Sequence, residues 1–364
     1  MTGLRVLVVG AGIAGLAVAH AARDRGIAVE VIERATESQP AGAGMYLPAN
    51  ATRALDDLGL GPAVTARAHP VTRQQVLDHR GRLLVDIDTH RLWNGVGDCV
   101  AIHRGDLLGA LRAATSDITI RRGVTVTGLD GAAEVTSSDG ATGSYDVIVG
   151  ADGVHSTVRR LAFGGPPARY VGQLAWRFVV EGQAGIADWT ARLGPGRTFL
   201  TIALGHDRVY CYADVNSAEP TDPAGDWRDL FAGFAEPVPS LLAHGADAHR
   251  NTIEEVVAPR WVDRGVVLVG DAAHASSPNM AQGAAMALED ALILADLLAD
   301  VDNDVARALA SFESRRAARV RRVQQHTHRR DRTRNLPAAI RNPTLRLAGS
   351  RIFESNYGPL RARP

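Results

Sequence analysis

The chain has 364 residues, 46% of them hydrophobic, and its acidic and basic residues balance to a formal net charge of zero. This length allows a large buried core in two lobes, and the balanced charge gives no reason to expect nucleic acid or a membrane as a partner. All 40 basic residues are arginine, which excludes catalysis by a lysine Schiff base, a P-loop lysine or a lysine general base.

The two cysteines, Cys99 and Cys211, form no C-x-x-C motif. Thiol–disulfide chemistry is therefore not expected, and a reducing compartment, the cytoplasm, is the default expectation. No apolar run is long and uncharged enough to cross a bilayer, since Leu288–Leu298 contains three acidic residues. The histidines show no metal-site spacing, so no metal is expected.

The first predicted elements form a βαβ unit. The apolar strand Leu4–Val9 leads into the turn Gly10-Ala11-Gly12-Ile13-Ala14-Gly15, a helix to about Arg25 and the strand Val29–Glu33. In such a turn the first glycine permits the tight bend, the second lets the backbone approach a pyrophosphate and the third lets the helix pack on the strand.

The acid at the end of the second strand narrows the choice of nucleotide. Glu33 is placed to accept hydrogen bonds from a ribose, and Arg34 beside it can stack on adenine or pair with a phosphate. A carboxylate at this position disfavours the 2′-phosphate of NADP, so FAD and NAD remain as ligands of the turn.

The rest of the chain alternates between two patterns. We expect a helix over 51–60, strands at Val76–Asp78 and Leu83–Ile87, a helix at Arg104–Ala114, and strands at Ile118–Leu129, Glu134–Ser137 and Asp146–Gly150. Longer strands at Leu174–Val180, Thr198–Leu204 and Arg208–Val215 suggest an antiparallel sheet in the second lobe. Parallel-type sequence returns at Val266–Gly270, followed by helices from Ala284 to about Ala299 and from about Val305 to Arg330.

Two of the buried strands end in an aspartate turn, Asp152-Gly153 and Gly270-Asp271. Open α/β sheets place ligands at the carboxyl ends of their strands. An aspartate there can cap the following helix or hold a sugar-chain hydroxyl. A simple Asx turn explains either one equally well when it is taken alone.

The order of these segments, with the glycine turn first, a basic helix start at Arg104 next and the two aspartate turns last, resembles the class A flavoprotein aromatic hydroxylases. The resemblance runs from Val6 to about Arg322 and is weakest in 166–262. It implies the para-hydroxybenzoate hydroxylase fold, an α/β arrangement with a Rossmann-like FAD-binding domain and an interleaved antiparallel-sheet substrate domain. The implied FAD-binding domain comprises residues 1–72, 98–165 and 262–335, the substrate domain 73–97 and 166–261, and a C-terminal segment 336–364.

The resemblance also implies a role for each matching residue. The glycine turn and Glu33 would hold the ADP half of FAD, Arg104 the ribityl-pyrophosphate region and Asp271 the ribityl chain, while Asp152-Gly153 would support both FAD and the reduced nicotinamide. The loop 42–45 would lie beside the moving edge of the flavin, although an ordinary flexible loop explains its glycines equally well. The implied cofactor contacts are Gly10, Gly12, Ala14, Gly15, Glu33, Arg34, Met45, Arg104, Asp152, Asp271, Pro278, Gly283 and Ala284.

The function that the resemblance implies is an FAD-dependent monooxygenase that hydroxylates a small aromatic or N-heteroaromatic compound with O2, through a flavin C4a-hydroperoxide. NADH or NADPH would dock transiently, because no second glycine-rich nucleotide motif is present. The alternatives are a flavin-dependent dehydrogenase or reductase on the same fold, and a non-catalytic flavin-binding sensor. We expect a monomer or a homodimer.

The sequence is less specific about the residues that would bind the substrate. Arg208, Tyr210 and Tyr212 alternate along one strand, so they share one face of the sheet. If this face looks toward the flavin, the arginine can bind an anionic substrate and a tyrosine can orient a phenol or N-heteroaromatic ring, but a solvated sheet face is slightly favoured. A loose similarity to FAD-dependent urate hydroxylases adds Arg197 to the expected substrate-side residues, Arg208 and Tyr210.

Three further features are expected to be structural. Trp176 is predicted in the core rather than as a substrate platform. The arginine-rich segment Arg315–Arg334 predicts a solvated helix face rather than a nucleic-acid patch. His326 and His328, two residues apart on that helix, are expected at its surface.

Overall fold

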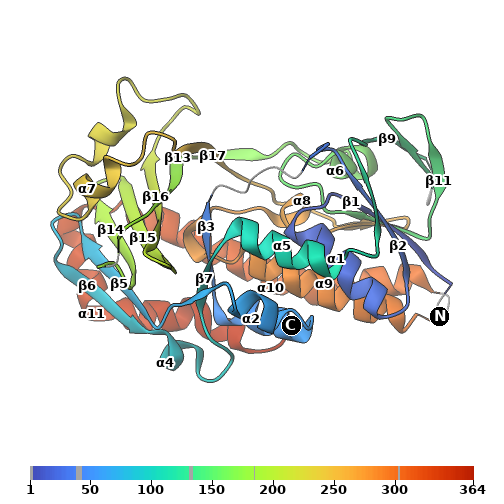
Figure 1. The fold of residues 1–364 in the computed structure, drawn as a ribbon, viewed down its shortest axis with the longest axis horizontal. Coiled ribbons are helices and arrows are strands. Elements are labelled where there is room, and N and C mark those ends of the chain that lie inside the picture. The colour runs from blue at the N-terminus through green and yellow to red at the C-terminus, as the bar shows by residue number, and fades with distance from the viewer. Residues whose placement is uncertain (1–2, 38–42, 131–133, 184, 302–303) are drawn as a thin grey trace.

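The computed structural model describes residues 3–37, 43–130, 134–183, 185–301 and 304–364. Two large sheets lie at opposite ends of the molecule, and long helices connect them (Figure 1). Because both sheets are combined with helices, the predicted α/β fold class is confirmed.

The six-stranded sheet has the order β18-β19-β12-β1-β2-β8, with all but β18 parallel. Its strands are β1 (Arg5–Val9), β2 (Ala28–Glu33), β8 (Thr119–Arg122), β12 (Val147–Gly150), β18 (Val262–Asp263) and β19 (Val266–Leu268). The central strands β1, β12 and β19 are neighbours, and Gly150 pairs with both Val9 and Leu268. The turns that follow these three strands therefore meet at one edge of the sheet.

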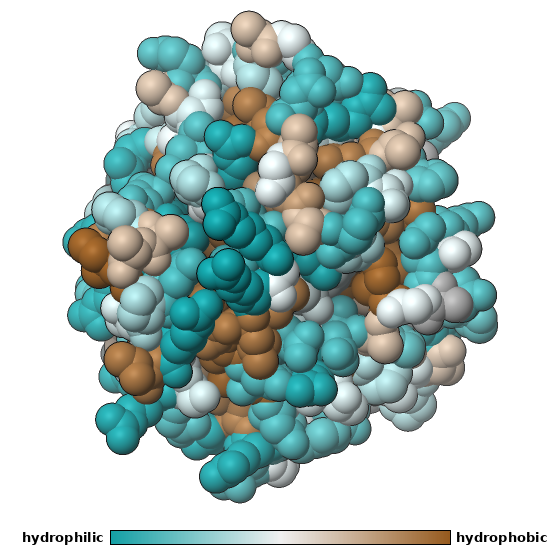
Figure 2. Space-filling model, turned by 90° about the vertical axis from the view of Figure 1, so that its left-hand side faces the viewer, coloured by the Kyte–Doolittle hydropathy of each residue, from teal (hydrophilic) through white to brown (hydrophobic). Residues whose placement is uncertain are grey.

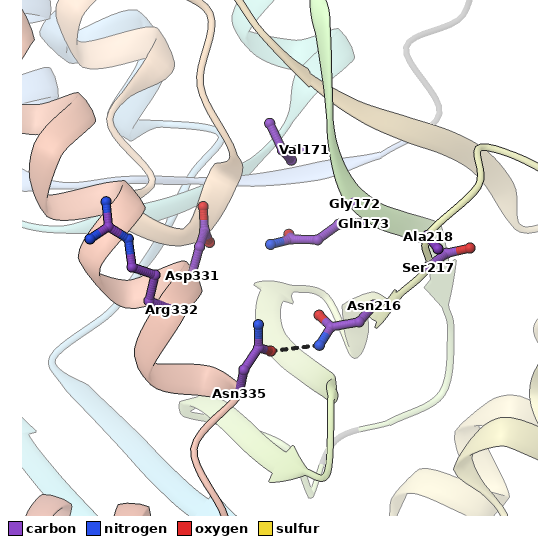
Figure 3. A pocket seen from close by; sticks show the side chains of 9 residues that line it. All are labelled: Val171, Gly172, Gln173, Asn216, Ser217, Ala218, Asp331, Arg332 and Asn335. Atoms are coloured by element: carbon purple, nitrogen blue, oxygen red, sulfur yellow. Dashed lines mark hydrogen bonds between the residues drawn. The ribbon is translucent and has the colours of Figure 1, made fainter.

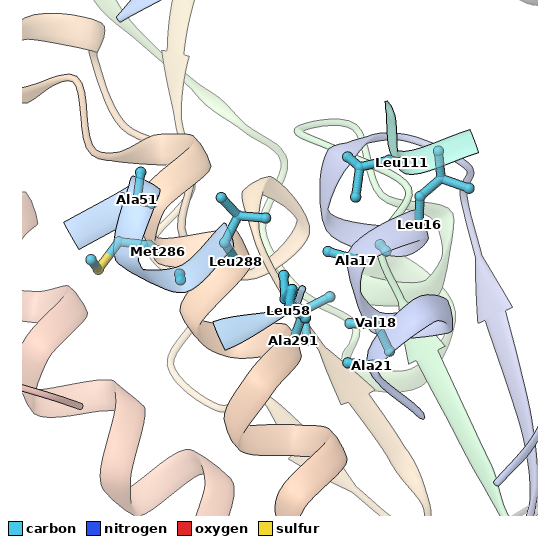
Figure 4. Close-up of a cluster of buried hydrophobic side chains, with 14 of the residues drawn as sticks. Leu16, Ala17, Val18, Ala21, Ala51, Leu58, Leu111, Met286, Leu288 and Ala291 are labelled. Atoms are coloured by element: carbon cyan, nitrogen blue, oxygen red, sulfur yellow. The ribbon is translucent and has the colours of Figure 1, made fainter. Parts of the chain in front are cut away.

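Small residues let two helices approach closely beside this sheet. Helix α1 (Ile13–Asp24) packs against α9 (Gly283–Ala299) through Ala17, Ala21, Leu288 and Ala291, which are all buried (Figure 4). The alanines lower the side-chain volume between the helices, and the leucine fills the remaining space. This contact brings the amino-terminal ends of two helices, far apart in sequence, into one layer.

The seven-stranded sheet has the order β17-β13-β16-β15-β14-β5-β6. Its strands are β5 (Arg73–Asp78), β6 (Leu83–Asp88), β13 (Arg169–Val180), β14 (Trp189–Gly194), β15 (Arg197–Gly205), β16 (Arg208–Asn216) and β17 (His249–Glu255). All neighbouring pairs are antiparallel except β14 with β5. One face carries a separate aromatic core in which Trp176 stacks on Trp227, so its predicted structural role is confirmed.

The other elements connect and cover the sheets. The remaining strands are β3 (Gly44–Leu47), β4 (His69–Pro70), β7 (Val100–His103), β9 (Val126–Asp130), β10 (Glu134–Ser137) and β11 (Thr142–Ser144). The remaining helices are α2 (Ala49–Asp57), α3 (Gly61–Thr65), α4 (Thr89–Trp93), α5 (Arg104–Ala114), α6 (Thr157–Phe163), α7 (Val238–Leu242), α8 (Asp271–His274), α10 (Val305–Arg334) and α11 (Ala338–Tyr357), with short 3-10 turns η1 (Trp227–Phe231), η2 (Pro278–Met280) and η3 (Gly358–Arg361).

Some predicted elements differ from the structure. The strand expected over Ile118–Leu129 is two strands in different sheets, β8 and β9, because the chain turns at Gly123 with a φ of 72°. The C-terminal segment 336–364 contains α11, which packs on β6. Around this end of the molecule, hydrophobic surface lies between hydrophilic areas (Figure 2). The predicted boundaries of the two domains stay a prediction.

The arginine-rich helix α10 is not simply solvated. Arg316 is 0% exposed and Arg334 is buried, and each pairs with a buried carboxylate. The predicted solvated face is therefore wrong at these two positions, because each guanidinium faces another element rather than water. His328 keeps a partly exposed side chain, consistent with the predicted surface position, and lies 2.6 Å from a carboxylate oxygen of Glu255.

Candidate functional site

The three glycine-bearing motifs converge at the carboxyl edge of the six-stranded sheet. A Cβ on Gly10 would lie 2.5 Å from the Ala151 carbonyl oxygen, so the first motif contacts the second. A Cβ on Gly270 would lie 2.8 Å from the Cβ of Ala14, so the third motif contacts the first. Gly10 and Gly270 also have φ values of 109° and 56°, which favour glycine.

The glycine turn and Glu33 form one unit. The Glu33 carboxylate accepts hydrogen bonds from the backbone N–H of Ala11 at 2.7 Å and of Ala35 at 2.8 Å. Each oxygen keeps a free lone pair, so the carboxylate can still accept bonds from a ribose. Arg34 beside it is exposed. Glu33 thus holds the turn in shape in addition to the predicted ligand contact.

The amino end of α1 suits a phosphate. No side chain caps this helix, whose N-cap is Gly12, and nothing lies within 4 Å of the position of a Cβ on Gly12. Helix N-termini carry unpaired N–H groups and a partial positive charge, which attract anions. The open space over Gly12 lets such an anion approach the backbone.

Asp152 has a structural task. Its carboxylate accepts bonds from the Ser156 hydroxyl at 2.5 Å and from the backbone N–H groups of Thr157 and Val158 at 2.7 and 3.1 Å. These bonds hold the turn before α6 and leave less capacity for a ligand. The neighbouring Gly153 has a φ of 82° and open space at its Cβ position, so the backbone itself is accessible there.

Asp271 begins α8, directly after the N-cap Gly270, and it is exposed. A Cβ on Gly283 would lie 4.0 Å from the Asp271 Oδ1, so the aspartate turn faces the first residue of α9. Ala284 follows it in the same turn, and no side chain caps α9. Pro278 begins η2 in the loop between the two helices. The predicted set Asp271, Pro278, Gly283 and Ala284 therefore belongs to one local region.

A buried ionic network, defined here as Glu289, Asp290, Arg316 and Arg319 with His274, supports this region from behind. Asp290 accepts bonds from the Gly270 N–H at 3.0 Å, from His274 at 2.7 Å and from Arg316 at 2.7 Å. Although burial alone would raise its pKa, the neighbouring His274 and Arg316 lower the pKa of Asp290 to about 2. The network therefore fixes the turn that presents Asp271.

The same network reaches the start of α9. Glu289 pairs with Arg316 and Arg319, each at 2.8 Å, and accepts a bond from the Asn50 amide at 3.1 Å. The Asn50 amide also donates to Gln282, the N-cap of α9, at 2.9 Å. Side chains of α2 and α10 thus fix the position of the α9 amino end through Gln282 and Glu289. The sequence signalled the acidic pair Glu289-Asp290, but nothing in it indicated these partners.

Arg104 and the segment before β3 complete the cofactor side. Arg104 begins α5, and its backbone N–H donates to the Ala43 carbonyl at 2.9 Å. Desolvation lowers the pKa of Arg104, and the nearby Asp271 carboxylate counteracts this. Met45 lies in β3, which pairs with β7. In the loop predicted at 42–45, Gly42 lies outside the described residues, and residues 44 and 45 belong to the strand β3.

The tyrosine face of β16 packs on β3. Tyr210 and Tyr212 are both buried and belong to the main core, not to the aromatic core of the opposite face. A Cβ on Gly44 would lie 2.5 Å from the Tyr210 side chain, so this strand packs directly on β3. The predicted solvated face is therefore wrong for both tyrosines. Burial raises the pKa of both phenols, which keeps them neutral at pH 7.

The three expected substrate-side residues do not come together. Arg208 lies at the start of β16 on the face of Tyr210, half-buried, with its Nε unpaired in the described part of the chain. Arg197 pairs with Val215 and donates to the Leu230 carbonyl oxygen, which places it on the opposite face. Arg177, on the neighbouring strand β13, lies on the inner face with its guanidinium 5.5 Å above the Tyr212 ring.

The residues present fit FAD. An uncapped helix end with open space over Gly12, a carboxylate with spare acceptors at Glu33 and the carboxylate of the exposed Asp271 lie in one layer at the edge of the sheet. These match a pyrophosphate, a ribose and a polyhydroxyl chain in turn. Within the described ranges, no group of three potential ligands could hold a metal, and no helix is long and apolar enough to cross a membrane.

Comparisons with known proteins agree with this geometry. The family model described as "FAD binding domain" matches residues 3–327. The aurachin C monooxygenase/isomerase of Stigmatella aurantiaca is 33% identical, over 87% of this chain and 86% of that protein. The 2-heptyl-3-hydroxy-4(1H)-quinolone synthase of Pseudomonas aeruginosa is 34% identical, over 89% of this chain and 88% of that protein. A crystal structure of Klebsiella pneumoniae HpxO complexed with FAD and uric acid superposes with a TM-score of 0.90 and 27% identity, covering 100% of this chain and 98% of that one.

Proposed function

This chain belongs to the FAD binding domain family of class A flavoprotein hydroxylases, and from that membership we propose how its own residues serve the activity. It is an FAD-dependent monooxygenase, with the para-hydroxybenzoate hydroxylase fold, that uses NAD(P)H and O2 to hydroxylate a small aromatic or N-heteroaromatic compound. We propose that this compound binds between the tyrosine face of β16 and the region around Asp271 and Gly283.

The observation that carries this proposal is the packing of Tyr210 on Gly44. It joins the inner face of the seven-stranded sheet to β3, whose residue 45 is among the proposed cofactor contacts. A substrate on this face would lie against neutral phenols in a site withdrawn from water. Relatives named for a 4(1H)-quinolone and for uric acid show that planar N-heteroaromatic rings suit enzymes of this family.

Bound FAD supplies the redox chemistry, which is acceptance of hydride from NAD(P)H and activation of O2. In this proposal the chain contributes binding, orientation and exclusion of water. Glu33 and the amino end of α1 hold the ADP half, and Asp271 holds the ribityl chain. The uncapped amino end of α9 directs its dipole at the ring. Tyr210 orients the substrate, and Arg208 favours negative charge on it.

The proposal is tested by purifying the protein with its flavin and measuring NAD(P)H oxidation with and without added aromatic compounds. We expect a phenol, an aromatic acid or an N-heteroaromatic to stimulate oxidation, with one O2 consumed per hydroxylated product. Stimulated oxidation without O2 consumption would indicate a dehydrogenase or reductase instead. A protein that binds flavin and aromatic compounds without any turnover would indicate a sensor.

We also propose that the protein works in the cytoplasm as a monomer or homodimer. Both cysteines are buried and free, which suits a reducing compartment. Size-exclusion chromatography with light scattering tests the oligomeric state, and cell fractionation tests the location.

A further inference from the structure

Buried polar atoms without partners gather at the inner face of the seven-stranded sheet. In the part of the chain that the structure describes, the Arg334 Nε and Nη1 and the Gln173 Oε1 have no hydrogen-bond partner, and the Tyr212 hydroxyl and the Asp214 Oδ2 have none beyond each other. Asp214 is 0% exposed and Gln173 is 3% exposed. Buried polar groups are nearly always satisfied in folded proteins, so several unsatisfied atoms in one place call for a ligand or ordered water.

These atoms come from three elements but point into one region. In the β13–β16 register, Ala175 pairs with Asp214 and Arg177 with Tyr212, so Gln173, Tyr212 and Asp214 share the inner face. Arg334 ends α10 and donates from Nη2 to the Asp214 Oδ1, which leaves its Nε and Nη1 as free donors. We call these four residues the inner-face cluster.

A cleft of about 430 Å³ opens beside the inner-face cluster. It is lined by Gln173 on one side and by Asp331 and Asn335 of the α10 end on the other (Figure 3). The Gln173 side chain extends into it, and the Asn216 amide donates to Asn335 at 2.5 Å across its floor (Figure 3). This volume falls in the usual range for small-molecule sites.

The cleft is connected to the proposed cofactor region. Asp331 accepts bonds from the Ser277 hydroxyl, at 3.0 and 3.2 Å, and from the Asn279 amide. These two residues flank Pro278, which is among the proposed neighbours of the isoalloxazine ring. The cleft and the inner-face cluster therefore lie between the tyrosine face of β16 and the loop that contains η2.

The free groups define the chemistry of a matching ligand. Arg334 offers two N–H donors, Asp214 and Gln173 each offer an acceptor oxygen, and Tyr212 can donate or accept. A carboxylate ligand would meet the Asp214 carboxylate, so the paired arginine does not provide a simple anion site. A ligand that matches these groups has a carbonyl acceptor next to an N–H donor along one edge of its ring.

We propose that the inner-face cluster recognises the lactam edge of an N-heteroaromatic substrate, its carbonyl on Arg334 and its ring N–H on Asp214 or Gln173. This inference rests on the proposed function and narrows its substrate class to 2-pyridones, 2-quinolones, purinones and similar rings. Because the site is built to bond both groups, it should reject analogues in which the N–H is methylated.

The test uses the FAD-loaded full-length protein and measures binding by the change in its visible absorption spectrum. The probes are 2(1H)-quinolone, 2-pyridone and uric acid, the N-methyl analogues of the first two, and benzoate. We expect at least one lactam to bind about tenfold or more tightly than its N-methyl analogue and than benzoate, which is the effect of one well-placed hydrogen bond.

Two variants locate the effect. Tyr212→Phe and Gln173→Leu each remove one free polar group, and we expect each to weaken binding of the lactam about tenfold while leaving the FAD content and the affinity for the N-methyl analogue unchanged. Tyr145→Phe is the matched control, because its hydroxyl bonds the Glu30 carboxylate beside the six-stranded sheet and not a residue of the cleft. This control should bind all probes as the wild type does.

Several results would overturn the inference. They are equal binding of a lactam and its N-methyl analogue, tighter binding of benzoate, binding of none of the lactams, or variants that bind lactams as the wild type does. The last result would mean that ordered water satisfies the inner-face cluster. If other aromatic compounds still stimulate NAD(P)H oxidation in such a case, the proposed function stands and only the lactam assignment fails. If no compound stimulates oxidation, the proposed function fails.

Discussion

Replacing Arg316 by methionine tests whether the buried ionic network holds the cofactor region. Arg316 is 0% exposed and donates to Asp290 at 2.7 Å, to Glu289 at 2.8 Å and to the Met286 carbonyl at 3.1 Å. Removing one partner of a buried ion pair costs about 3–5 kcal/mol. Because Arg319 and His274 still contact the two carboxylates, we expect the lower end, about 3 kcal/mol.

The expected effect can be measured by thermal unfolding with FAD in excess. With an unfolding entropy of about 2.1 cal/mol/K per residue, 364 residues convert about 3 kcal/mol into a Tm lower by about 4 °C. Arg322→Met, an exposed position on the same helix, is the control and should shift Tm by less than about 1 °C. Equal shifts in the two variants would refute a stabilising role for the network.

The Arg316→Met variant also shows whether the network supports only the turn that presents Asp271 or the whole domain. Asp290 orients the Gly270 N–H and with it the turn that presents Asp271, whereas the ADP half is expected at Glu33 and α1. We therefore expect Arg316→Met to weaken FAD about tenfold or more while binding of ADP to the apoprotein is unchanged. Calorimetric titrations with both ligands measure this. Parallel loss of both affinities would show that the network supports the whole domain and not this turn.

Further predictions concern both sides of the site. Glu33→Ala should yield FAD-depleted, nearly colourless protein, because the bonds to Ala11 and the ribose are lost together; an unchanged flavin spectrum at equal yield would contradict this. Gly44→Ala should weaken substrate binding, since its Cβ would lie 2.5 Å from Tyr210, and unaltered affinity would disprove that contact. Arg197→Ala should leave substrate affinity within about twofold but lower Tm, because its side chain bonds Leu230 on the outer face; a large affinity loss at constant Tm would place it in the site. The pKa of Asp290 is lowered from 3.8 to about 2, so its stabilisation of about 2 kcal/mol is present above pH 4 and is lost as the pH falls toward 2. The gap in denaturation midpoint between wild type and Asp290→Asn should therefore narrow between pH 4 and pH 2, and a constant gap would contradict the lowered pKa.

The cofactor side was predictable because its signals are local. The bend at Gly10, the close helix packing at Gly15 and the acid at Glu33 lie within one βαβ unit, where spacing along the chain determines spacing in space. The convergence of the aspartate turns followed from a topological rule, since parallel neighbours such as β1, β12 and β19 place their carboxyl ends at one edge. The capping role of Asp152 was one of two alternatives that the sequence left open.

The partners of the buried charges were not predictable. Arg316 and Arg334 lie in a run of similar arginines, and only the path of α10 decides which of them meet Glu289, Asp290 and Asp214. Sequence separation of more than a hundred residues between Arg334 and Asp214 removes any local signal. The alternation of Arg208, Tyr210 and Tyr212 did contain a hint, because continuing it by two residues reaches Asp214 on the same face.

The position of Arg197 shows how one extra residue in a strand can move an expected substrate-side residue to the opposite face of the sheet. The turn His206-Asp207 pairs Gly205 with Arg208. An uninterrupted hairpin would then place Arg197 opposite Asn216, on the face of Tyr210. Instead, the register shifts between Ala203 and Gly205, and Arg197 pairs with Val215 on the outer face. A β-bulge adds one residue to one strand and so reverses the face of every side chain beyond it. The similarity to urate hydroxylases at Arg197 therefore does not place that guanidinium beside Tyr210, and the arginines of β13 and β16 on this face are Arg177 and Arg208.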